Sequence, residues 1–102
     1  MTAAVDIGTL IVRTPGVLGG RPRIAGTRIS VATITLLDRQ GVSPELIAAD
    51  EYPQLSLAQV YAALAYYHAN RPTIDEEIEA ADREYETLAA AARQDGQGSR
   101  PA

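Results

Sequence analysis

The chain has 102 residues, a net charge of −4 and no cysteine, which allows one domain with a modest core and excludes disulfides and thiolate chemistry. Hydrophobic residues make up 46% of the chain, yet no apolar run approaches the roughly 20 residues that a membrane-spanning helix needs. Because the N-terminus has neither a basic flank nor a long apolar segment, we expect no secretory signal and a cytoplasmic protein.

The charges are divided unevenly along the chain. Residues 1–43 have a net charge of +3, and residues 44–102 have a net charge of −7. Such a division is typical of a protein whose two halves meet different partners. The alternative is structural: the arginines brace turns at one end, and the acids cover a solvated helix at the other.

Residues 9–29 predict a short β arm. The segment 9–13 is rich in β-branched residues and precedes a Thr-Pro-Gly turn signal. Two further extended pieces, around residues 23–25 and 27–29, lie among glycines that permit unusual backbone angles. Strands this short are marginal alone, so we expect them to pair with one another across a dimer or to lie against the helices.

A first helix is predicted over residues 31–40. Ser30 suits its N-cap and Gly41 suits the left-handed position after its last turn. Its β-branched residues lower its intrinsic helix propensity, so this helix depends on packing against others.

Two more helices, joined by a tight turn, complete a three-helix core over residues 31–70. Ser43 predicts the start of a short helix over 44–51, and Pro53 forbids its continuation. Ser56 and Gln59 form the pattern of a capping box at the start of a longer helix over 56–70. A short helix, a turn and a longer helix are the layout of a helix-turn-helix. The predicted buried stripe of the longer helix contains Leu57, Val60, Tyr61, Leu64 and Tyr67.

A fourth helix is predicted over residues 73–93, with Thr73 as its cap and a cluster of acids in its first turns. Residues 1–93 then form a single domain, and residues 94–102 are polar and predicted to be disordered. The fourth helix has an apolar seam that is too short to establish a coiled coil, so its own core, a second copy or another protein must cover it. The seam contains Ile74, Ile78, Ala81, Tyr85, Leu88 and Ala92.

Nothing in the sequence favours an enzyme. His68 is the only histidine, and a packed or surface position is more typical of such a residue than a catalytic one. Zinc ligation needs clusters of cysteine and histidine, which are absent. We therefore expect no catalytic residue, metal, cofactor or small-molecule substrate.

DNA binding is favoured by the layout but not by the charges. Ser56, Ala58 and Gln59 lie at the start of the predicted recognition helix, where base edges are usually met, and glutamine can pair with adenine. However, no arginine or lysine occurs between Gln40 and Arg71, although phosphate contacts normally supply most of the affinity. The alternative is a packing module that never touches DNA. The predicted phosphate contacts are Arg21, Arg23, Arg28 and Arg39.

Three segments in order carry a resemblance to a known family: GRPRIAGTRI at 20–29, GVSPELI at 41–47 and YPQLSLAQVYAALAYY at 52–67. Over roughly residues 9–72 the chain resembles the domain-of-unknown-function family numbered four-three-three. The resemblance implies a mainly α fold, with a homeodomain-type helix-turn-helix and a short β arm. It also implies a bacterial antitoxin that neutralises a PIN-like ribonuclease toxin and binds its own promoter as a transcription regulator.

Two hypotheses follow for the partners. In the first, the arginine-bearing half meets promoter DNA, and the acidic C-terminal helix meets the toxin. In the second, the protein is an interaction module with a dimer seam along residues 74–92 and no nucleic-acid role. A homodimer is expected because helix-turn-helix proteins read two half-sites. The predicted partner contacts are Ile74, Ile78, Ala81, Tyr85 and Leu88.

Overall fold

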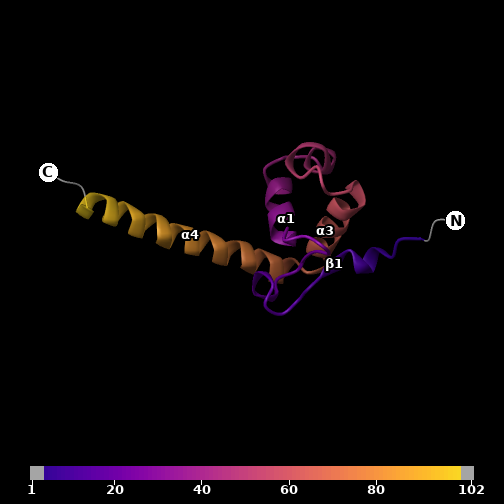
Figure 1. Ribbon diagram of the computed structural model, residues 1–102, viewed down its shortest axis with the longest axis horizontal. Helices are drawn as coiled ribbons and strands as arrows, with labels where there is room; N and C mark the ends of the chain where they lie inside the picture. The colour runs from indigo at the N-terminus through magenta and orange to yellow at the C-terminus, as the bar shows by residue number, and fades with distance from the viewer. Residues whose placement is uncertain (1–3, 100–102) are drawn as a thin grey trace.

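The computed structural model describes residues 4–99, with side chains described as far as residue 93. The long helix α4, Arg71–Ser99, projects from a head made by the preceding elements (Figure 1). The molecule therefore measures 70 Å along its longest axis but only 28 and 22 Å across. The fold is mainly helical with a short N-terminal β hairpin, which confirms the predicted class.

The β arm pairs within one chain. Strand β1, Ile11–Val12, runs antiparallel to strand β2, Arg23–Ile24, with Ile11 opposite Ile24. Ile24 is fully buried in the core, so the arm lies against the helices and needs no second copy to pair its strands. One single-turn 3₁₀ helix, η1 at Ile7–Thr9, precedes β1, and another, η2 at Leu18–Gly20, lies between β1 and β2.

Helix α1, Val31–Arg39, begins and ends as its capping residues predict. The Ser30 hydroxyl accepts a hydrogen bond from the Thr33 amide at 3.1 Å. Gly41 has a φ of 87°, the left-handed conformation that glycine adopts without a steric cost. Within the helix, the buried Thr35 hydroxyl donates to the Val31 carbonyl at 2.9 Å, so it lies in the core without an unsatisfied donor.

The two predicted helices joined by a tight turn are present. Helix α2, Pro44–Leu46, continues directly into a wider π-helical turn, η3, at Ile47–Glu51, and the predicted segment 44–51 is therefore helical throughout. Helix α3, Leu57–Ala69, begins at the predicted capping box. The Gln59 amide donates to the Ser56 hydroxyl at 3.1 Å, and the Gln59 side-chain oxygen accepts from the Ser56 amide at 2.7 Å.

The buried face of α3 differs from the predicted stripe. Val60, Leu64 and Tyr67 are buried, as predicted, but Leu57 is 41% exposed and Tyr61 is 48% exposed. Helix α1 packs on the α3 side that also carries Ala63, so the buried face is turned away from Leu57 and Tyr61. Apolar residues surround much of α3, and the sequence pattern alone could not decide which side would face the core.

Helix α4 begins two residues before its predicted cap. Asn70 ends α3, and its carbonyl accepts from the Ile74 amide at 3.1 Å, so one residue closes one helix and opens the next. Pro72 is tolerated in the first turn, where an amide hydrogen would have no helical partner. The helix continues to Ser99 into the segment predicted as a disordered tail, of which residues 100–102 lie outside the described residues.

The base of α4 is part of the core. Ile74 is fully buried and Ile78 is 3% exposed, packed with residues of the arm, α1 and α3. The head therefore extends as far as residue 78, and only the later turns of α4 are free of it. Among the described helices, none is long and apolar enough to cross a membrane.

Candidate functional site

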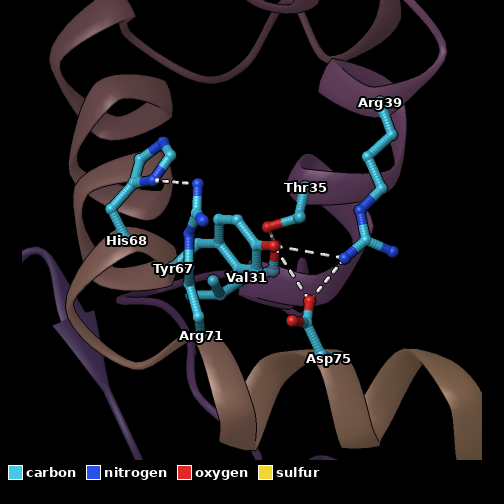
Figure 2. Close-up of polar contacts among 7 residues, drawn as sticks. All are labelled: Val31, Thr35, Arg39, Tyr67, His68, Arg71 and Asp75. Carbon is cyan, nitrogen blue, oxygen red and sulfur yellow. Dashed lines mark hydrogen bonds and ion pairs between the residues drawn. The ribbon is translucent and has the colours of Figure 1, made fainter.

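A polar cluster joins α4 to the head (Figure 2). The Tyr67 hydroxyl on α3 donates to Asp75 Oδ1 on α4 at 2.9 Å and accepts from Arg39 Nη2 on α1 at 3.2 Å. Arg39 also forms an ion pair with Asp75. The hydrogen bond with Tyr67 raises the pKa of Arg39 above its ordinary value, and the charge of Asp75 adds to this effect although burial opposes it. One triad thus ties three helices together.

The Tyr67 ring is also flanked by two cations. The guanidinium carbons of Arg71 and Arg39 lie 5.5 and 5.7 Å from its centroid, within the range of a cation–π interaction. His68 is exposed, and its Nδ1 lies 3.2 Å from Arg71 Nη2 (Figure 2). His68 and Arg71 thus belong to the same set of contacts between α4 and the head, which we call the joint.

The four arginines predicted to contact phosphate lie in two environments. Arg23 is half-buried and donates to the Thr27 carbonyl at 2.9 Å and to the Thr14 hydroxyl at 3.1 Å, so it braces the β arm. Arg39 is engaged in the joint described above. Arg21 and Arg28 are exposed on the arm and are the two of the four that an anion can reach without breaking these contacts.

The residues predicted to meet base edges are only partly free. Ser56 and Ala58 are exposed, and Gln59 is half-buried. The side chains of Ser56 and Gln59 are hydrogen-bonded to each other's backbone in the capping box. Pairing Gln59 with adenine through both its amide oxygen and its amide nitrogen would therefore sacrifice part of the cap of α3.

The outward side of α3 exposes large apolar residues that the sequence pattern had placed in the core. Its exposed residues include Leu57, Tyr61 and Ala65, and Leu46 of α2 is 54% exposed. The Tyr61 hydroxyl donates to Glu45 Oε1 at 3.0 Å, and this hydrogen bond raises the pKa of Tyr61. The sequence did not reveal that Leu57 and Tyr61 are exposed, because both match the periodicity of a buried stripe.

The predicted partner seam of α4 is divided by the fold. Ile74 and Ile78 are buried in the core of the head, so a partner cannot reach them unless the base of α4 unfolds. Ala81, Tyr85 and Leu88 are exposed, with Tyr85 at 70% and Leu88 at 62%. Because these three residues are spaced by four and three positions, they lie on one side of the helix.

Glu77 lies where α4 approaches the arm. One of its carboxylate oxygens, Oε2, is buried and has no hydrogen-bond partner among the described residues. Burial raises the pKa of Glu77, while the positive charges of Arg21 and Arg13 lower it to a lesser extent. The ionised carboxylate is therefore less favourable in the folded chain than in the unfolded one.

Replacing Glu77 with glutamine should raise the melting temperature at neutral pH by about 1–2 °C. Because burial raises the folded-state pKa of Glu77, the folded chain is favoured while this carboxyl is protonated. That contribution to stability is present at low pH and is lost as the pH rises through the raised pKa. The gain should disappear in acid, where the carboxyl is protonated in both states. Thermal melts at acid and neutral pH measure this difference, and the exposed Glu79→Gln is the matched control. A gain that is equal at both pH values would contradict the prediction.

Among the described residues, neither a grouping of metal-binding side chains nor the hollow beside the β arm indicates a functional site. No group of three or more histidine, cysteine, aspartate or glutamate side chains within residues 4–93 is arranged to hold a metal ion. An open hollow of about 520 Å³ lies beside the arm and is lined by Arg13, Pro15, Gly16, Gly19 and Gly20. Arg13 donates to the Gly20 carbonyl at 3.1 Å, so its charge is turned toward the loop's own backbone.

The comparisons with known proteins agree with this architecture. The model of the family described as "Protein of unknown function (DUF433)" matches residues 11–67, from β1 through most of α3. The crystal structure of a DUF433 member protein from Anabaena variabilis ATCC 29413 is similar, with 41% sequence identity and a TM-score of 0.65, over 70% of this chain and 69% of that chain. No curated protein matches the chain. The resemblance seen in the sequence is thus confirmed, and the chain belongs to the DUF433 family.

Proposed function

We propose that this protein is the antitoxin of a bacterial toxin–antitoxin pair, a non-catalytic subunit that neutralises a PIN-like ribonuclease by binding it directly. The observation that carries the proposal is the free part of α4. It leaves the head after Ile78 and presents apolar side chains that no described residue of this chain covers.

The chemistry of this segment suits a helix that docks in a groove. Tyr85 and Leu88 are largely exposed on one side of α4, and Asp82, Glu84 and Glu86 are exposed around them. An apolar stripe with an acidic surround is the form in which an amphipathic helix binds a partner. A ribonuclease needs a basic surface to hold its polyanionic substrate, so an acidic helix is electrostatically complementary to it.

The test is co-purification with the nuclease encoded by the neighbouring reading frame. A chain that ends at Pro72 would lose Ile74 and Ile78 from the core, so the truncation should instead end at Ala80. We expect this truncated chain to melt cooperatively but to lose both nuclease binding and neutralisation.

Point variants of the full chain make the same test without shortening it. Tyr85→Ser/Leu88→Ser should weaken nuclease binding roughly 100-fold, the effect of removing two hot-spot side chains. Arg83→Gln/Thr87→Ala, on the opposite side of the same turns, is the matched control and should bind like the wild type. Undiminished binding by the Tyr85/Leu88 variant and by the truncation would remove α4 as the toxin contact.

Promoter binding is a second part of the proposal, through the exposed arginines of the β arm rather than through α3. Arg21 and Arg28 are the predicted phosphate contacts that remain on the surface. We expect a salt-dependent gel shift of the promoter fragment, and Arg21→Ala/Arg28→Ala should lower the salt slope by about 2. The exposed Arg93→Ala is the control.

The alternative remains a protein–protein interaction and dimerisation module with no DNA role. Absence of any shift at low salt would favour it. A homodimer is proposed because two half-sites require two subunits. The pairing of the β arm within one chain does not add to that argument.

A further inference from the structure

The outer face of α2 and α3 presents a surface that neither the α4 contact nor the arginine arm uses. We define it by Leu57 and Tyr61 on α3, which are 41% and 48% exposed, together with Leu46 on the adjoining α2, which is 54% exposed. Leu57 and Tyr61 are one helical turn apart, and the hydrogen bond from Tyr61 to Glu45 links this side of α3 to α2. Large apolar side chains gathered on one exposed face mark an interaction surface more often than singly scattered ones do.

The two segments that contact α3 beside this face, α2 and η3, carry exposed acids, which we call the acidic rim. Glu45, Asp50 and Glu51 are all exposed on α2 and η3. Residues 41–70 contain no arginine or lysine. A DNA phosphate brought to this face would meet negative charge and hydrocarbon, with no cation to replace its counterions. The position that a helix-turn-helix usually gives to the major groove is here chemically mismatched to nucleic acid.

We propose that the α2–α3 face is a protein-docking surface for a basic surface of the nuclease, separate from the contact made by α4. This inference rests on the proposed antitoxin function and adds to it a second toxin contact. A second copy of this chain fits less well, because an isologous contact would bring two acidic rims together. The free part of α4 projects away from the head that carries this face (Figure 1), so the two contacts can be altered independently.

The experiment measures the affinity of full-length variants for the purified nuclease from the neighbouring reading frame by calorimetric titration. Leu57→Ser/Tyr61→Ser should weaken binding roughly 30-fold. Asp50→Lys/Glu51→Lys should weaken it roughly 10-fold, and this loss should shrink as salt is added. Asp38→Lys, an exposed acid at the end of α1, is the control for the change of charge and should bind like the wild type.

Each contrary outcome is distinct. If the α2–α3 variants bind the nuclease like the wild type while Tyr85→Ser/Leu88→Ser does not, the inference is wrong and the antitoxin function stands. If the wild type does not bind the nuclease at all, both fall.

Two results would assign the face to another partner and overturn the inference. One is tighter promoter binding by Asp50→Lys/Glu51→Lys with unchanged nuclease affinity, which would make the face a DNA surface. The other is conversion of a dimer to a monomer by Leu57→Ser/Tyr61→Ser, measured by light scattering, with unchanged nuclease affinity. Should the serine variant fail to fold in circular dichroism, the lysine variant alone decides the test, because its substitutions are at exposed positions.

Discussion

Replacing Ile74 with alanine lowers the free energy of unfolding by about 2–5 kcal/mol, the range for deleting a fully buried aliphatic side chain and leaving a cavity. Ile74 has no exposed surface and lies at the base of α4, packed with residues of the arm, α1 and α3. The loss is a large fraction of the total stability of a domain of this size. Urea denaturation followed by circular dichroism measures it.

The matched control for Ile74 is Leu88→Ala on the same helix. Leu88 is 62% exposed, so its truncation should change the free energy of unfolding by less than about 0.5 kcal/mol. Equal losses for the two variants would mean that the apolar seam of α4 is not divided between the head and a free surface.

Replacing Tyr67 with alanine costs about 3–5 kcal/mol, because the ring is part of the core and its loss leaves a cavity. Tyr67→Phe keeps the ring and removes only the hydroxyl, so it should cost about 1 kcal/mol, the net value of a typical intramolecular hydrogen bond. The cost of Tyr67→Phe stays small because Asp75 and Arg39 are part-exposed, at 38% and 44%, so water can replace the lost hydroxyl.

The same denaturation experiment tests Tyr67, with His68→Ala as the neighbouring control. His68 is exposed, so its truncation should have a small effect. If Tyr67→Phe were as damaging as Tyr67→Ala, the hydroxyl triad rather than the ring would hold α4 on the head.

The arginines show why a charge pattern did not by itself identify a binding site. Arg23 braces the β arm, and Arg39 ties α1 to α3 and α4. Arg21 and Arg28 remain on the surface. The partners of Arg39 lie 28 and 36 residues away along the chain, so no local pattern could have revealed them.

The helix boundaries were accessible from the sequence because the forces that set them are local. A serine hydroxyl caps a helix by reaching an amide three residues on, and a glycine ends one by adopting a positive φ. Ser30, Gly41, Ser43 and Ser56 all act as predicted. The start of α4 was misplaced because Thr73 resembles a cap, whereas Asn70 serves both neighbouring helices.

By itself, the amino-acid sequence determined the family, the helix-turn-helix layout, the capping residues and the presence of an apolar seam on the last helix. Only the tertiary structure decided which apolar residues face water: Leu57 and Tyr61 outward on α3, Ile74 and Ile78 inward on α4. The physical reason is that capping is settled within one helical turn, whereas burial depends on how distant helices pack against one another.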